Sequence, residues 1–376
     1  MTETKAKPKG LSIRPINVDN KGQLTAQMGK LKIETQKKVK PSVICQASIR
    51  RPTVTVQSAF VEDVPPELPP KTKKSQRFSI PNFDVNHEEK QREIEKIEKE
   101  LARDLFKSPT YAHDIYSYLK MVEKRWHIPE DFLDHGEINA KTRAILMDWF
   151  IQVQVYLELL DTTLHMAVAF VDRILSNQKV TANSLQLLGI TCILIAAKYY
   201  EDFHHRFPPH VSDLVYLTDN TYKVSQVFVM EMIVLKKFKF DLSTTDPVST
   251  MEHFLEISPT DSMTKSMAKY MLDLTTTCHK FASILPTVLA ASCVYVARKL
   301  FVMDKVWTCG LEYFSGYTEK DLMKCVTELL RILIKAPTAK LQGARKKHAA
   351  STFTRISHHK LLETKPAAIL KALENK

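Results

Sequence analysis

Residues 185–200 read LQLLGITCILIAAKYY, and this stretch decides the fold class. No charged side chain occurs between Leu185 and Ala197, so a helix here would be apolar on nearly every face. A helix of that kind belongs at the centre of a bundle, where other helices cover all of its sides. The apolar run is also shorter than the roughly 20 residues that a membrane-spanning helix needs. The sequence therefore predicts a buried central helix and no membrane partner.

A second stretch repeats this pattern further along the chain. Leu188–Lys198 (LGITCILIAAK) aligns with Leu289–Lys299 (LAASCVYVARK), and each has small residues early and a lysine at its end. Such similarity indicates an internal duplication with one central helix in each copy. Chance similarity between two buried helices is the alternative. Because the repeat is too long for a solenoid unit, two sequential bundles are expected.

Apolar residues at three- to four-residue spacing predict two sets of helices around these centres. The first set is expected at residues 112–125, 140–159, 162–178, 184–200 and 222–237, with a short helix near 208–217. The second set is expected at residues 248–256, 263–281, 286–302, 310–315 and 319–333. The chain holds only 8 glycines, whereas many nucleotide-binding and catalytic folds depend on glycine turns. The predicted fold class is therefore all-α, with two tandem five-helix bundles.

Both ends of the chain differ in composition from the predicted bundles. Residues 1–107 are interpreted as a mostly disordered basic arm with a charged lead-in helix near 87–106. Residues 341–376 are interpreted as a basic C-terminal tail that packs only partly. Much of the excess behind the formal charge of +12 lies in these ends. Basic tails explain that charge better than a nucleic-acid-binding face, so nucleic acid is not an expected partner.

Motifs across the middle of the chain resemble those of the cyclin family. The segment TRAILMDWFIQV (Thr142–Val153) resembles the helix that opens the cyclin box. FVDRIL, LQLLG, AAKYYED, LTDNTY and MEMIVLKKFKFDL follow in the order that cyclins show. The LTDNTY segment and the Ile-Gln-Val-Gln end of the first helix point to the B-type, or mitotic, subfamily. The resemblance implies an N-terminal cyclin box at 108–243 and a C-terminal cyclin box at 244–340.

The resemblance also implies a surface that binds a cyclin-dependent protein kinase. Lys198 and Glu231 match kinase-contacting positions of the family, and Leu187 matches the apolar support beside them. For Lys198 alone, a solvated helix end is the alternative. Tyr111 and Ile115 lie four residues apart ahead of the box and match further kinase contacts. Packing of these two side chains against the box is the alternative.

Five positions match the groove with which cyclins capture Arg-x-Leu segments of substrates and inhibitors: Ile145, Leu146, Trp149, Leu185 and Gln186. An apolar groove with a polar rim suits the capture of two short anchors. Core packing is the alternative for Ile145 and Leu146. The leading methionine of the family is Thr142 here, and this change removes apolar surface from the expected groove.

Arg143 and Asp172 match a buried ion pair that ties the first two helices of the box together in the family. Inside a bundle, each charge is tolerated only because the other is present. Removal of Arg143 is therefore expected to cost about 3–5 kcal/mol of stability. Two separate surface charges are the alternative interpretation.

No enzyme signature accompanies these motifs. The chain has no Gly-x-Gly-x-x-Gly, Walker-type loop, nucleophile elbow or zinc signature, so no catalytic residue, cofactor or metal is expected. His204, His205 and His210 lie close together without a convincing ligand set. The resemblance implies a regulatory subunit that binds and activates a cyclin-dependent kinase at the G2/M transition, in mitosis or meiosis. A cyclin-fold transcription-type factor that binds nucleic acid or general factors is the alternative.

Further partners and a location are expected on the same basis. The partners are a mitotic-type kinase, Arg-x-Leu substrates or inhibitors, and the ubiquitin-ligase degradation machinery, and the location is the nucleus and cytoplasm. B-type cyclins usually carry an Arg-x-x-Leu destruction box in the N-terminal arm, and residues 1–105 contain none. Arg143–Leu146 fits the letters but lies in a helix that is expected to be buried.

Overall fold

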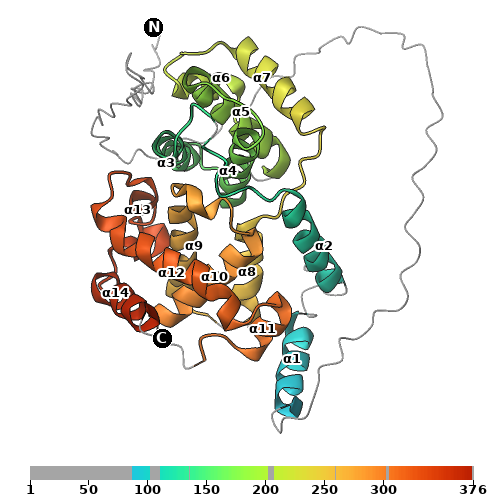
Figure 1. Cartoon of the computed structure of the whole chain (residues 1–376), viewed down its shortest axis with the longest axis vertical. Coiled ribbons are helices and arrows are strands. Elements are labelled where there is room, and N and C mark those ends of the chain that lie inside the picture. Colours follow the sequence, from blue (N-terminus) through green and yellow to red (C-terminus); the bar gives the residue numbers. More distant parts are fainter. Residues whose placement is uncertain are drawn as a thin grey trace, which may run out of the picture. The chain divides into compact units, whose positions relative to one another are not determined.

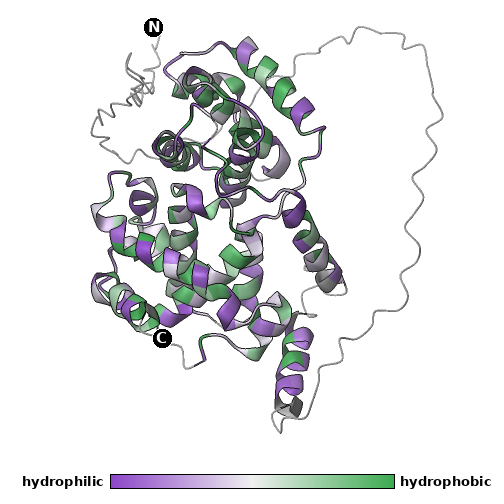
Figure 2. Cartoon of the chain, in the orientation of Figure 1, coloured by the Kyte–Doolittle hydropathy of each residue, from purple (hydrophilic) through white to green (hydrophobic). Residues whose placement is uncertain are grey.

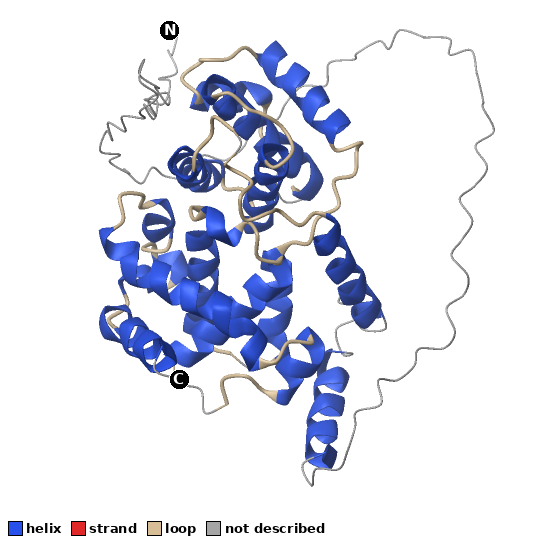
Figure 3. Cartoon of the chain, viewed as in Figure 1, coloured by secondary structure: helices blue, strands red, loops and turns tan. Residues whose placement is uncertain are grey.

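The computed structural model describes residues 87–101, 111–134, 136–201, 207–258, 260–301 and 305–374. Every regular element among them is an α-helix or a short 3₁₀ helix, so the all-α prediction is confirmed for this part of the chain (Figure 3). The lead-in helix predicted near 87–106 corresponds to α1 (His87–Leu101). The rest of the predicted N-terminal arm lies outside the described residues.

The first set of helices comprises α2 (Ala112–Arg125), α3 (Ala140–Leu157), α4 (Asp161–Leu175), α5 (Ala182–Tyr200), α6 (Val211–Leu217) and α7 (Val224–Lys237) (Figure 1). In this set α5 packs against α3, α4, α6 and α7. The predicted bounds are close to these. Helix α3 ends at Leu157, before the expected residue 159, because Glu158 adopts the left-handed conformation with a φ of 54°.

The second set comprises α8 (Pro247–Ile257), α9 (Ser262–Thr276), α10 (Pro286–Leu300), α11 (Cys309–Ser315) and α12 (Glu319–Lys335). Helix α10 packs against α8, α9 and α12. The helix expected at 263–281 is divided, since α9 ends at Thr276 and the 3₁₀ turn η3 (His279–Phe281) follows. The hydroxyls of Thr275, Thr276 and Thr277 each donate to the carbonyl three residues earlier, which competes with the continuing helix.

The two expected central helices are α5 and α10. In α5 every residue from Leu185 to Ala197 is buried, and α10 is buried along most of its length. Among the described residues, α5 is the one helix that is long and apolar enough to cross a membrane. However, 72% of its 18-residue apolar stretch is buried inside the protein. Gly189 permits the close approach to α3, because a Cβ there would lie 2.9 Å from the ring of Phe150.

Short side chains at the helix starts explain where the elements begin. Asn139 accepts a hydrogen bond from the backbone of Thr142 at the start of α3. Asp246 accepts from two backbone amides of α8, and Pro247 occupies its first turn, where a missing N–H has no cost. At α12 the predicted capping arrangement is present, since the Thr318 amide donates to Asp321.

The C-terminal segment differs from the basic tail that its composition predicts. After η4 (Ala336–Thr338), which directly follows α12, it carries α13 (Gly343–Lys347), α14 (Leu361–Glu374) and the 3₁₀ turns η5 (Ser351–Phe353) and η6 (Ile356–His358). Helix α14 packs on α12 and α10, and Lys347, His348 and Ile356 are buried. The prediction missed this packing because a run of basic residues normally indicates solvated side chains, whereas Lys347 meets buried carboxylates.

Candidate functional site

Lys198 and Glu231 form an ion pair at the edge of the first bundle. Lys198 ends the central helix α5, and its Nζ lies 2.6 Å from Oε1 of Glu231 in the middle of α7. The lysine side chain is 47% exposed and the glutamate 13% exposed. The pair therefore keeps donor capacity toward solvent on the lysine, and an ammonium held by one carboxylate can still donate to another protein. Leu187 lies about three turns before Lys198 on α5 and is buried.

Helix α7 exposes apolar side chains around this ion pair. Phe228, Val229, Met232 and Ile233 are all exposed, whereas Val227 and Val234 are its only buried residues. Figure 2 shows the hydrophobic residues along this helix. The sequence predicts a helix at 222–237, but its apolar run gives no sign of which face meets the bundle. An exposed apolar surface of this kind is typical of an interaction site.

Helix α2 presents a second exposed apolar stripe. Tyr111 is 62% exposed and Ile115 is 48% exposed, which disfavours the alternative that they pack against the box. Tyr118 and Met121 continue the stripe at helical spacing and are also exposed. Sequence reasoning missed these two, although the spacing from Tyr111 onward was a detectable signal.

The opposite side of α2 is anchored to the second helical set. The Tyr116 hydroxyl and the Lys120 ammonium both donate to the carbonyl of Ser315, which ends α11. Glu123 is buried and accepts from both the backbone and the hydroxyl of Thr287 at the start of α10. Burial raises the pKa of Glu123, although these two hydrogen bonds oppose the shift. The exposed stripe of α2 is thus fixed in orientation by contacts on its far side.

The five groove positions lie on α3 and α5, which pack against each other. Leu146 and Leu185 are fully or nearly fully buried, and only Ile145 is half-buried. Trp149 and Gln186 are also buried, and the indole N–H of Trp149 has no hydrogen-bond partner in the described residues. The burial of Leu146 fits the alternative that this side chain packs in the core. Ile145 is the most accessible of the five groove positions. The groove itself stays a prediction.

Arg143 and Asp172 form a buried bidentate ion pair between α3 and α4. Nε and Nη2 of the arginine each lie 2.5 Å from a carboxylate oxygen of Asp172. The remaining nitrogen, Nη1, donates to the carbonyl of Thr276 at the end of α9. All three contacts are buried, so the guanidinium is satisfied on every edge that the structure describes. The pair also connects the first helical set to the second.

A cavity of about 120 Å³ lies between the two sets, and its lining includes Arg143, Asp172, Pro247 and Leu289. Neither Lys198 nor Glu231 lines it. The candidate site at these two residues is therefore an exposed surface, and an exposed apolar surface around a charged pair suits a protein partner.

Among the described residues, no group of three or more His, Cys, Asp or Glu side chains is placed to hold a metal ion. His204 and His205 lie outside those residues.

Two family domains account for both helical sets. The cyclin N-terminal domain matches residues 114–243 and the cyclin C-terminal domain matches residues 245–362. The chain belongs to the cyclin family. The second match runs past residue 340, so it includes α13 and the turns that follow, which the expected box boundary left out.

Several relatives carry B-type names, which confirms the resemblance found in the motifs. The G2/mitotic-specific cyclin-B2 of Macaca fascicularis is 32% identical over 336 residues, covering 88% of this chain and 83% of that protein. The G2/mitotic-specific cyclin-B of Spisula solidissima is 32% identical over 85% of this chain and 69% of its own length. A solved viral cyclin from herpesvirus saimiri has a TM-score of 0.49 and 21% identity, over 58% of this chain and 94% of that one.

Proposed function

We propose that this chain is a regulatory subunit that binds and activates a cyclin-dependent protein kinase at the G2/M transition, in mitosis or meiosis. The observation that carries the proposal is the Lys198–Glu231 pair, set among the exposed apolar residues of α7. The names of the relatives, G2/mitotic-specific cyclin-B and cyclin-B2, support the timing. They do not favour the alternative of a transcription-type factor.

The chain would act by binding one conformation of the kinase better than another. A partner shifts a two-state equilibrium only by such a difference, and near-complete activation needs about 5.5 kcal/mol of preference. An interface of roughly 2,000 Å² or more is expected for a lasting partnership of this kind. The apolar stripes of α2 and α7 would supply area, while Lys198 would donate to acceptors on the kinase. The catalytic residues would belong to the kinase.

Co-purification with a mitotic cyclin-dependent kinase, followed by a histone phosphorylation assay, tests this proposal. The double variant Lys198→Ala with Glu231→Ala should lose at least about tenfold in affinity and activity, because a charged anchor in an interface centre contributes strongly. Lys299→Ala is the matched control, since Lys299 is the exposed lysine near the end of the other central helix. Wild-type binding and activity in the double variant would remove this surface as the kinase site.

The groove on α3 and α5 is proposed to capture Arg-x-Leu segments. Fluorescence polarisation with a labelled Arg-x-Leu peptide measures this directly. Ile145→Ser should weaken peptide binding about tenfold, because it removes the accessible apolar anchor of the five groove positions. Val229→Ser, on exposed α7, is the control and should bind the peptide as the wild type does. If Ile145→Ser binds the peptide as tightly as Val229→Ser and the wild type do, the groove does not lie at these positions.

We also propose a location in the nucleus and cytoplasm and turnover by a ubiquitin ligase. Residues 1–105 hold no Arg-x-x-Leu destruction box, so the degradation signal would have another form. Microscopy of a fluorescent fusion through the cell cycle tests the location. Half-life measured at mitotic exit, with and without residues 1–86, tests the degradation route. A half-life that is unchanged by this deletion would place the signal in the helical part.

A further inference from the structure

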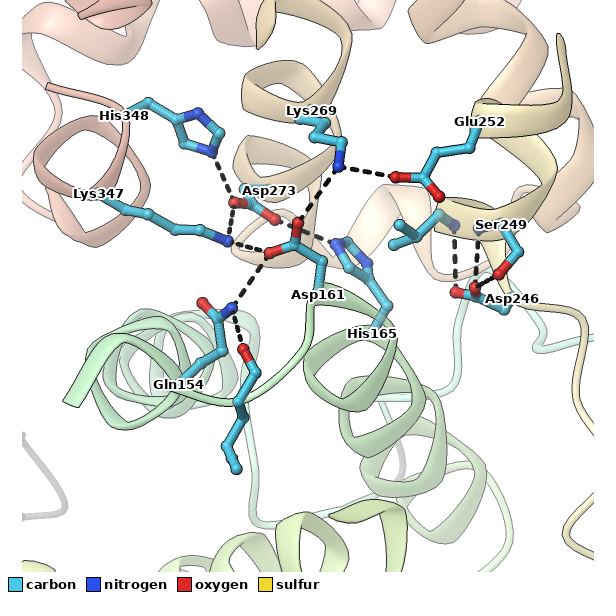
Figure 4. Close-up of polar contacts among 12 residues, drawn as sticks. Gln154, Asp161, His165, Asp246, Ser249, Glu252, Lys269, Asp273, Lys347 and His348 are labelled. Atoms are coloured by element: carbon cyan, nitrogen blue, oxygen red, sulfur yellow. Dashed lines mark hydrogen bonds and ion pairs between the residues drawn. The ribbon is translucent and has the colours of Figure 1, made fainter. Parts of the chain in front are cut away.

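A buried polar cluster joins three separate parts of the chain around Asp273 of α9 (Figure 4). One carboxylate oxygen lies 3.1 Å from Nε2 of His165 on α4. The other lies 2.7 Å from both Nζ of Lys347 and Nε2 of His348, at the end of α13. All four side chains are buried. The first helical set, the second helical set and the C-terminal segment therefore meet at a single carboxylate.

Lys347 also connects the C-terminal segment directly to the first helical set. Its Nζ lies 2.7 Å from Oδ1 of Asp161, the first residue of α4 (Figure 4). The Gln154 amide donates to the same oxygen and to the carbonyl of Leu159, which fixes the turn between α3 and α4. On its outer side, Asp161 faces Lys269 of α9 at 3.8 Å. One buried ammonium thus bridges two carboxylates from different bundles.

The other end of the segment is attached to α3. The backbone amide of Gly343 donates to Oδ1 of Asp148 at 2.6 Å, and both residues are buried. A Cβ at Gly343 would lie 2.7 Å from that oxygen and 2.9 Å from the backbone carbonyl of the same residue. No side chain fits there without movement. Between residues 343 and 348, the segment therefore makes a bond to α3, one to α4 and two to α9.

The charges of this cluster depend on one another. Burial alone would raise the pKa of Asp273, but Lys347 and the hydrogen bonds from His165 and His348 hold it well below its ordinary value. Burial would lower the pKa of Lys347, and its two carboxylate partners raise it instead. If the segment detached, Asp273 would keep only its contact with His165. Partial release is therefore unfavourable, and the segment is expected to stay bound or detach as one unit.

We propose that residues 343–348 form a strap that locks the first cyclin box to the second and holds α3 and α9 in a fixed relation. This device goes beyond the proposed function, because it operates in the chain alone and needs no kinase. Its consequence is that the surface on the first box and the body of the second behave as one rigid unit.

Hydrogen exchange measured by mass spectrometry on the full chain, without partners, tests the strap. Lys347→Met removes the ammonium and keeps the apolar stem. It should speed exchange in α3 and α9 by about tenfold, with less change in α12, since local opening raises exchange only where the lost contacts were. Lys346→Met is the matched control, because Lys346 is the exposed neighbour, and it should exchange as the wild type does.

Two results would overturn the strap. One is wild-type exchange of α3 and α9 in Lys347→Met. The other is an equal acceleration in every helix, which would mean a loss of global stability and no special link between the boxes. If Lys347→Met does not fold, as judged by circular dichroism, Asp161→Asn decides. It removes one partner of Lys347 at a partly exposed position and should give the same pattern with about threefold acceleration.

Discussion

The two cyclin boxes place an aspartate at the same position and satisfy it differently. The sequence offset that relates Leu188 to Leu289 also relates Asp172 to Asp273, and both aspartates are buried. Asp172 receives its cation from Arg143, on the neighbouring helix of its own box. Asp273 receives Lys347 from a segment that follows the five helices of the second box. Both boxes therefore hold a buried carboxylate at this position, but its cationic partner comes from a different part of the chain in each.

The last helix of each box shows the same contrast. Helix α7 of the first box leaves apolar residues such as Phe228 and Met232 exposed. Helix α12 of the second box buries Leu329 and Leu330, and α14 packs against it. The C-terminal segment thus completes the second box from within the chain. The first box has no such cover among the described residues, so its last helix remains available to another protein.

The largest expected effect comes from Arg143→Ala in the first box. The substitution leaves Asp172 buried without its partner and removes the bond to the carbonyl of Thr276. It should lower the free energy of unfolding by about 3–5 kcal/mol, as measured by urea denaturation. The control is Arg125→Ala, because Arg125 pairs with Asp241 at the surface and should contribute less than about 1 kcal/mol. Similar losses in both variants would contradict the importance of burial.

Leu330→Ala and Met232→Ala compare the two last helices directly. Leu330 is fully buried, so its truncation should cost about 2–5 kcal/mol in the same denaturation assay. Met232 is exposed, and its truncation should change stability by no more than about 0.5 kcal/mol. A large loss from Met232→Ala would mean that α7 is covered in the isolated chain.

Asp273→Asn tests the second aspartate through its pH dependence. The folded pKa of Asp273 lies well below its ordinary value, so the charged form stabilises the fold above about pH 4 and that contribution is lost as pH falls through the folded pKa. The variant should lose about 1.5–3 kcal/mol at pH 7. Stability curves measured between pH 7 and pH 2 should keep a constant separation above about pH 4 and draw together below it. A constant difference between the variant and the wild type across this range would contradict the assignment.

The smallest effect concerns the two central helices. Gly189→Ala adds a Cβ that meets Phe150 and Leu146, so it should destabilise the protein by about 1 kcal/mol, although alanine is the better helix former. At the matching position of the second box, Ala290→Gly should cost a similar amount, because it loses helix propensity and leaves a small void. Thermal unfolding of both variants measures this. If Gly189→Ala stabilises the protein, then α3 and α5 can move apart to accommodate the added Cβ.

The sequence was sufficient for the parts of the fold that depend on local patterns. Central helices such as Leu185–Ala197 show their burial in their own composition, and caps such as Thr318 with Asp321 act over a few residues. The relation of the two boxes was also visible, since a duplicated helix retains its order of large and small residues.

The C-terminal packing could not be predicted in this way. Lys347 lies in a basic run that looks solvated, and its partners Asp161 and Asp273 are distant in sequence. The exposure of α7 was equally hidden, because apolar residues occur on several sides of this helix and do not reveal which side remains free. Both features depend on what covers a surface in three dimensions.

The anchoring of α2 has a consequence for how the molecule can be divided. Its outward stripe belongs to the first box by sequence, yet Tyr116 and Lys120 hold it to the carbonyl of Ser315 in the second. A fragment that ends between the boxes would retain the Lys198–Glu231 pair. It would lose the hydrogen bonds to Ser315 that fix the orientation of α2. A protein that binds both α2 and α7 therefore requires both cyclin boxes to be present and folded. A truncated chain would present only the α7 part of that binding surface in its fixed orientation.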